Sequence, residues 1–205
     1  MVIHPSIGTA LARERSGALQ RQAAAARLAR QARSGGQMPA SAPVLLRDGS
    51  RVLIRPVRPS DAVLLAEGFT RLSERSRRMR FLGRKHTLTE ADLRFYTDVD
   101  HHNHEALGAL DHARGGGVGI ARYIRDREDP RAAEIAVTIV DDWQGRGLGI
   151  ELMDRLSERA RQEGICRFTA MVAADNAAVA GLLRCYRAEL VDCGHGTLEY
   201  EMALD

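Results

Sequence analysis

The sequence predicts a mixed α/β (α+β) fold behind a short N-terminal arm. Residues 134–140 alternate in side-chain character with a period of two, which is typical of a strand. From Leu148 onward, apolar side chains recur at every fourth position, as they do on one face of a helix. Similar strand and helix patterns fill most of the 205-residue chain, which is long enough to bury one core. We therefore expect a sheet covered by helices.

Residues before this central segment predict a hairpin, three helical segments and two strands. The hairpin spans residues 44–55 around the tight turn Asp48-Gly49. The helical segments are 60–69 with Ser60 as cap, 72–80, and one from the cap Thr89 to about 97. The strands 105–110 and 118–125 flank a glycine turn at 115–117. After the central helix we expect a strand at 167–172, a helix at 176–186, and strands at 189–192 and 198–202.

The arm, residues 1–43, differs in composition from the domain that we expect at residues 44–205. It contains six arginines and one glutamate, whereas the remainder carries 24 basic and 26 acidic residues, so the net charge of +3 arises in the arm. Residues 9–33 favour a helix, but their apolar stripe is too thin to be stable alone, and residues 34–43 have the composition of a linker. We expect the arm to dock on the domain or a partner, for instance in self-association, or to remain a fluctuating tail.

Composition also argues against several classes of protein. The balanced charge of the body offers no footprint for nucleic acid, and no run approaches the ~20 apolar residues of a membrane helix. Three cysteines without a C-x-x-C pair argue against a disulfide framework and for reduced thiols in the cytoplasm. A polar cluster matches no zinc-site spacing, so we expect no metal there; its members are His101, His102, His104 and Glu105.

The segment Gln144-Gly145-Arg146-Gly147-Leu148-Gly149 joins the central strand to its helix. Its three glycines allow a sharp turn and close approach of a ligand to the backbone. The free amides and positive dipole at the start of a helix favour a phosphate, and Arg146 adds a charge. The lysine of a P-loop is absent, and Ile150 replaces the third glycine of a Rossmann fingerprint. The pattern predicts a phosphate cradle of another kind, or else a glycine-rich turn without a ligand.

The spacing Gln/Arg-x-x-Gly-x-Gly at a strand-to-helix junction resembles the GNAT superfamily of acyl-CoA-dependent N-acetyltransferases. The resemblance implies a mixed, mostly antiparallel, twisted sheet of six to seven strands flanked by helices. It also implies acetyl-CoA as cofactor, its pyrophosphate on the loop and its pantetheine arm on the preceding strand. The cofactor-binding residues implied here are Ile139, Val140, Gln144, Gly145, Arg146, Gly147, Leu148, Gly149, Ile150 and Asn176. Asn176 is alternatively, or additionally, a helix cap.

Further stretches, residues 46–61, 72–83 and 88–93, look like bacterial protein lysine acetyltransferases, notably the cyclic-AMP-regulated actinobacterial type. This resemblance implies a protein lysine as acetyl acceptor. A small-molecule amine remains an alternative, as does a non-catalytic domain that senses acyl-CoA. The regulated relatives carry a cyclic-nucleotide domain before the transferase, and 43 residues are too few for one, so we expect no direct response to cyclic AMP.

Glu134 is the candidate catalytic base. A lysine amine has a pKa of ~10.4 and must lose a proton before it can attack a thioester. Glu134 begins the central strand with its side chain opposite to those of Ile135 and Val137, and the resembling enzymes use an acid at this position as base. The alternative is an exposed glutamate at the end of a strand.

The group that protonates the leaving thiolate is not evident. Many relatives use a tyrosine seven residues after the asparagine that opens the last helix, and counting from Asn176 gives Leu183. Tyr186 lies one turn further and receives no role. The Gly-Phe pair that usually follows this helix is replaced by Arg187-Ala188.

Overall fold

The computed structural model describes residues 43–204. The helix expected over residues 9–33, most of the linker, and the self-association expected of the arm lie outside the described residues. Among the helices that are described, none combines the length and apolar character needed to cross a bilayer.

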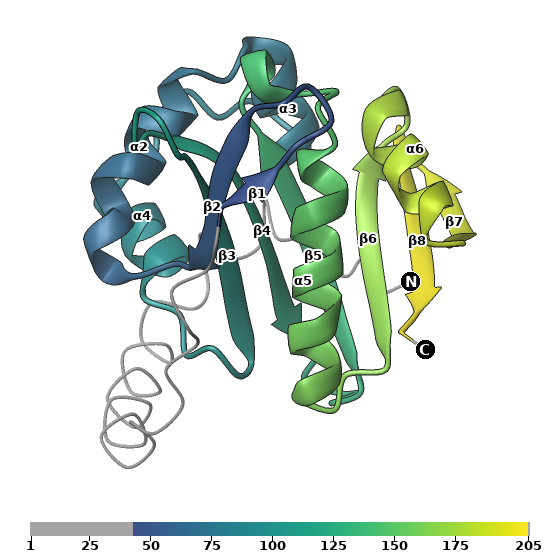
Figure 1. The fold of residues 1–205 in the computed structure, drawn as a ribbon. Coiled ribbons are helices and arrows are strands. Elements are labelled where there is room, and N and C mark those ends of the chain that lie inside the picture. The colour runs from purple at the N-terminus through teal and green to yellow at the C-terminus, as the bar shows by residue number, and fades with distance from the viewer. Residues whose placement is uncertain (1–42, 205) are drawn as a thin grey trace.

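One twisted sheet runs through the domain (Figure 1). Its strand order is β1-β2-β3-β4-β5-β6-β8-β7, and every neighbouring pair is antiparallel except β5 with β6. The strands are β1 Val44–Leu45, β2 Arg51–Pro56, β3 His104–Asp111, β4 Gly117–Arg125, β5 Ala132–Ile139, β6 Arg167–Ala173, β7 Glu189–Gly194 and β8 Thr197–Ala203. The mixed, mostly antiparallel sheet is thus confirmed. Its eight strands exceed the six to seven that the family resemblance implied, and they include both strands of the predicted hairpin, since the two-residue β1 pairs with β2 at the sheet edge.

Helices cover both faces of the sheet. They are η1 Pro59–Asp61, α2 Ala62–Thr70, α3 Glu74–Phe81, α4 Glu90–Thr97, η2 Asp141–Trp143, α5 Leu148–Gln162 and α6 Ala177–Cys185. The expected cap Thr89 is confirmed, since its hydroxyl accepts from the amide of Asp92 at 3.1 Å. The expected cap Ser60 is wrong. Pro59 starts a short 3-10 turn that includes Ser60, and the N-cap of α2 is Asp61.

The apolar stripe of α5 forms the centre of the core. Its buried residues recur every fourth position as predicted, at Leu148, Leu152, Leu156 and Ala160. Gly119 of β4 lets this helix approach the sheet closely, since a Cβ there would lie 3.1 Å from a methyl of Leu148. Because side chains alternate along a strand, Ile120 and Arg122 of β4 point to the other face, which α2 and α4 cover.

The strands β5 and β6 are connected through α5 and pair over only three positions. The last pair joins Glu134 to Thr169, after which β5 continues to Ile139 and β6 to Ala173 without further pairing between them. The sheet therefore opens at Glu134.

Candidate active site

A cavity of about 660 Å³ lies where β5 and β6 separate. The amide of Val140 donates to the carbonyl of Val118 at 3.1 Å, which fixes the alternation of the β4–β5 ladder. By this alternation, the main-chain groups of Ile135 and Val137 point toward the opening rather than toward β4. A strand edge presented in this way can bind an extended ligand through amide hydrogen bonds.

The glycine loop closes one end of the cavity. Gly145 and Gly147 have φ of +75° and +90°, a left-handed conformation that glycine adopts without strain. Gly147 is the N-cap of α5 and offers no side chain, so the first amides of this 15-residue helix point at the space in front of it. Amides at a helix start favour an anion, and the fifteen residues behind them add the positive end of a dipole.

Gln144 braces this loop rather than projecting freely. Its side-chain amide donates to the carbonyl of Ile139 and to the carboxylate of Asp141, each at 3.0 Å. Asp141 also accepts from the amide of Ser73 and from the hydroxyl of Ser76. The loop is therefore fixed to both β5 and the start of α3.

A cation that the sequence did not single out, Arg47, lies against the loop glycine Gly147. The side chain of Arg47 lies over Gly147, where an added Cβ would be 3.3 Å from it, and it lines the cavity. Arg146, expected in this role, instead forms an ion pair with Asp48 at 3.0 Å and lies 4.6 Å from the ring centre of Trp143. Arg47 lies about a hundred residues before the loop in sequence, so no local pattern connects the two. They meet only in the fold, where the amide of Arg47 donates to the carbonyl of Arg146.

The other sequence-predicted residues divide into two groups. The side chains of Val140 and Leu148 are buried in the core, so only their main chains could contact a ligand. Residues that line the cavity are Ile139, Gln144, Gly145, Gly147, Gly149, Ile150 and Asn176. Asn176 also caps α6, where its Oδ1 accepts from the amide of Val179 at 3.2 Å.

Glu134 lines the cavity at the point where the strands diverge. Its side chain leaves β5 on the same face as those of Ala136 and Thr138, opposite to α5. Arg80 of α3 also lines the cavity. Burial lowers the pKa of the Arg80 guanidinium, and the neighbouring Tyr96 and Glu134 oppose that effect, which places a cation within electrostatic reach of the carboxylate.

Tyr186 serves to join two helices. Its hydroxyl donates to a carboxylate oxygen of Asp154 at 2.6 Å and lies 3.1 Å from the carbonyl oxygen of Ile150. Burial and the Asp154 carboxylate raise the pKa of this phenol well above its usual range. Leu183, at the counted position, is 2% exposed, and the described lining of the cavity includes no tyrosine.

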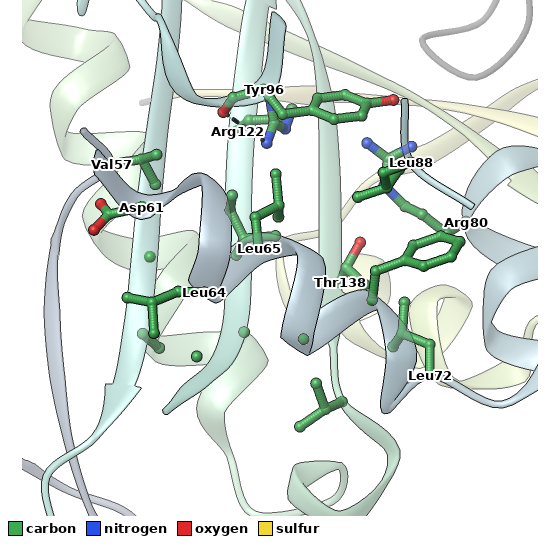
Figure 2. Close-up of a pocket in the computed structure, with 18 of the residues that line it drawn as sticks. Val57, Asp61, Leu64, Leu65, Leu72, Arg80, Leu88, Tyr96, Arg122 and Thr138 are labelled. Atoms are coloured by element: carbon green, nitrogen blue, oxygen red, sulfur yellow. Dashed lines mark hydrogen bonds between the residues drawn. The ribbon is translucent and has the colours of Figure 1, made fainter. Parts of the chain in front are cut away.

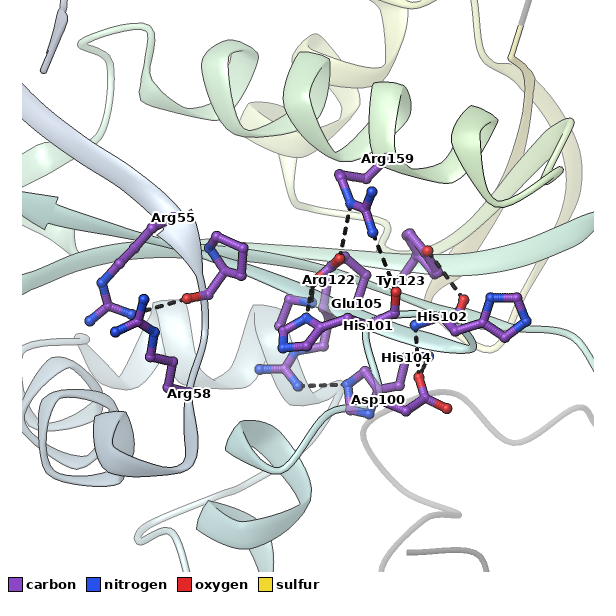
Figure 3. Close-up of polar contacts among 12 residues, drawn as sticks. Arg55, Arg58, Asp100, His101, His102, His104, Glu105, Arg122, Tyr123 and Arg159 are labelled. Carbon is purple, nitrogen blue, oxygen red and sulfur yellow. Dashed lines mark hydrogen bonds and ion pairs between the residues drawn. The ribbon is translucent and has the colours of Figure 1, made fainter. Parts of the chain in front are cut away.

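The three histidines of the polar cluster have separate partners (Figure 3). Nδ1 of His101 lies 2.6 Å from the carboxylate of Glu105, which also pairs with Arg159. His102 pairs with Glu163. His104 precedes Glu105 on β3 and therefore projects from the opposite face of the sheet, where its Nε2 accepts a hydrogen bond from Arg122 at 3.1 Å.

Comparison with known proteins identifies the family. The model of the acetyltransferase (GNAT) domain matches residues 51–186. Acetyltransferase Pat of Mycolicibacterium smegmatis is 34% identical over 137 residues, which are 67% of this chain and 41% of that protein. Acetyltransferase PA5475 of Pseudomonas aeruginosa is 41% identical over 135 residues, which are 65% of this chain and 70% of that protein.

A solved structure agrees with the sequence comparisons. The crystal structure of the GNAT domain of S. lividans PAT matches with a TM-score of 0.75 at 26% identity, covering 82% of this chain and 99% of that one. The similarity to Pat extends over less than half of that protein's length. The strand opening, the glycine loop and these matches together show that the chain belongs to the GNAT family of acetyltransferases.

Proposed function

We propose that this protein transfers an acetyl group from acetyl-CoA to a primary amine, with Glu134 as general base and a protein lysine as acceptor. The observation that carries the proposal is the position of Glu134. It is the last residue of β5 that pairs with β6, so it lies where the two strands separate. The cavity of about 660 Å³ at this opening, which Glu134 lines, is called the donor cavity from here on.

The residues around the cavity fit this donor. The first amides of α5 and the glycines 145, 147 and 149 would receive the pyrophosphate, with Arg47 supplying positive charge. The free edge of β5 at Ile135 and Val137 would receive the amides of the pantetheine arm. Acetyl-CoA, when bound, supplies the activated thioester carbonyl.

Glu134 would take a proton from the acceptor ammonium, directly or through one water, so that the neutral amine attacks. As the new C–N bond replaces the C–S bond, the nitrogen loses its second proton, which water relays to the departing thiolate, and Glu134 returns the first proton to solvent. This assignment needs no tyrosine, in accord with the structural roles of Leu183 and Tyr186.

The lysine acceptor rests on the resemblance of residues 46–61, 72–83 and 88–93 to bacterial protein lysine acetyltransferases. A cytoplasmic location belongs to the same proposal and is supported by three free cysteines, Cys166, Cys185 and Cys193. A small-molecule amine is the second candidate, because a compact second cavity adjoins the donor cavity.

The decisive variant is Glu134→Gln. We expect kcat for acetyl transfer to lysine peptides to fall about 100-fold or more, because the amine loses its base. Thiol release at saturating acetyl-CoA measures the rate, and mass spectrometry identifies the acetylated lysines. Affinity for coenzyme A should be preserved in titration calorimetry, since the loop is untouched.

Glu201→Gln is the matched control, because Glu201 of β8 lies opposite Thr169 in the sheet and outside the cavity lining. An unchanged kcat in Glu134→Gln would remove this residue from the mechanism. Binding of coenzyme A without thiol release for any amine would favour the non-catalytic, acyl-CoA-sensing alternative.

A further inference from the structure

A second cavity of about 100 Å³ lies between the sheet and the helices α2, α3 and α4 (Figure 2). Most of its wall is apolar, formed among others by Leu65, Leu72, Phe81 and Leu88. It adjoins the donor cavity, because Arg80, Ala136 and Thr138 line both. It therefore opens on the same face of β5 from which the side chain of Glu134 projects.

Arg122 of β4 brings a buried cation into this apolar pocket. Arg122 is only 2% exposed, and its guanidinium carbon lies 4.5 Å from the ring centre of Tyr96. Its hydrogen bonds go to Nε2 of His104 at 3.1 Å (Figure 3) and to the carbonyl of Tyr96 at 3.4 Å (Figure 2). Both partners are neutral, because burial and the charge of Arg122 lower the pKa of His104 to about 3.

Arg80 supplies a second cation at the same end of the pocket (Figure 2). The two guanidinium groups repel each other, and burial together with Arg80 lowers the pKa of Arg122 to about 9. Within residues 43–204, the ion pairs include neither guanidinium. Asp61, the carboxylate in the pocket wall, is already paired with Arg55 at 2.7 Å.

Glu134 compensates Arg80 in part, but two neighbouring cations in an apolar pocket remain destabilising unless a further anion pairs with them. A carboxylate is the anion that a guanidinium binds best, through paired charge-assisted hydrogen bonds. The acyl acceptor of the proposed reaction must place its amine near Glu134, and the shared wall at Arg80 sets the second cavity next to that position.

We infer that Arg80 and Arg122 bind the carboxylate of a free amino acid, whose amine faces Glu134 and whose apolar side chain enters the second cavity. This inference rests on the proposed acetyl transfer and adds a small-molecule acceptor class to it. The product is an N-acetyl amino acid, formed by the same bond exchange. The burial of Arg122 and a volume of about 100 Å³ fit the side chain and carboxylate of a single amino acid.

The test compares apolar amino acids with their amides, which keep the amine and side chain but lack the carboxylate. Alanine, valine, leucine, methionine and phenylalanine, each paired with its amide, would be assayed by thiol release with acetyl-CoA. We expect kcat/KM for the best amino acid to exceed that for its amide about 10-fold or more, because a charged hydrogen-bond partner is lost in the amide. Binding of the same compounds to the protein would be measured separately by titration calorimetry.

Arg80→Met and Arg122→Met should each lower the ratio of kcat/KM for the amino acid to kcat/KM for its amide about 10-fold or more, because only the acid carries the carboxylate. Comparing the two substrates within one variant cancels any effect of Arg80 on Glu134. Arg78→Met is the matched control, since Arg78 lies on the same helix but pairs with Asp175 at the surface. Circular dichroism checks folding. If Arg122→Met does not fold, the partly exposed Arg80 still provides the test.

Equal kcat/KM for acids and amides, or an acid preference that survives in Arg80→Met, would overturn the carboxylate site. The proposed transfer can fail separately: binding of an amino acid that Arg80→Met abolishes, without thiol release from any amine, would retain the site and contradict the reaction.

Discussion

The two cavities on β5 are built by different means. The donor cavity presents main-chain groups, namely the free edge of β5 and the amides that follow Gly147. The second cavity presents side chains, with Arg80 and Arg122 set among apolar residues from three helices and the sheet. Main-chain groups can bind acetyl-CoA, because the donor is the same molecule in every reaction. Selection of one amine among many requires side chains. We therefore propose that the first cavity recognises the donor and that the second selects the acceptor.

Gly147→Ala tests the backbone-built cavity and should have the largest effect. A residue with a Cβ is strained by about 1–2 kcal/mol in the left-handed conformation, so the loop should relax and the dissociation constant for coenzyme A should rise about 10-fold. Titration calorimetry measures it.

Gly164→Ala is the control for that variant. Gly164 has φ of +76°, with nothing within 4 Å of an added Cβ, and it follows α5 at the end remote from the loop. We expect a similar loss of stability and an unchanged affinity for coenzyme A. Equal affinities for Gly147→Ala and the wild type would contradict the cradle.

His104→Gln tests the side-chain-built cavity through pH. The folded-state pKa of His104, about 3, lies below the unfolded value of 6.5, so above pH 6.5 the residue contributes no pH dependence. As the pH falls below 6.5, the unfolded chain takes up a proton that the folded chain refuses, and stability is lost at about 1.4 kcal/mol per pH unit until about pH 3.

Glutamine keeps an acceptor for Arg122 but does not titrate. Between pH 7.5 and pH 5.5, the wild type should therefore lose about 1.4 kcal/mol more unfolding free energy than His104→Gln, in urea titrations at both pH values. Asp100, His101 and Arg122 also act on this imidazole, and they are present in both proteins. Parallel losses in the two proteins would show that His104 is protonated in the fold and would weaken the case for an uncompensated Arg122.

Arg47→Met tests the side-chain contribution to the donor cavity and should have the smallest effect. The dissociation constant for coenzyme A should rise about 3-fold, as for a partly solvated charge near a phosphate. Arg146→Met should leave the constant unchanged and instead reduce stability by about 1 kcal/mol, because it removes the contacts with Asp48 and Trp143. The reverse result would restore Arg146 as the residue that faces the phosphate.

Local patterns predicted most of the fold correctly. The alternation at 134–140, the four-residue recurrence after Leu148 and the cap at Thr89 depend on neighbouring residues, and all three are confirmed. The cap at Ser60 is wrong because the preceding Pro59 favours a 3-10 turn over a direct helix start. The family resemblance implied six to seven strands, whereas the hairpin and the six later strands predicted from local patterns number the eight that form.

The candidate site could be predicted only where it is made of backbone. A glycine spacing at a strand-to-helix junction is continuous in sequence, so the loop was evident, although the roles of its residues remain predictions. The second cavity was not evident. Arg122 meets Tyr96 and His104 only because β3 and β4 pair in one register and α4 packs on that face.

The sequence by itself determined the helices and strands, their order along the chain and the glycine loop before α5, because each depends on interactions within a few residues. Tertiary structure decided that Arg47 rather than Arg146 lies over the loop, that Tyr186 joins α6 to α5, and that two arginines share one apolar pocket. These outcomes depend on which surfaces pack together and on the burial of charge, and neither is encoded within a single stretch of the chain.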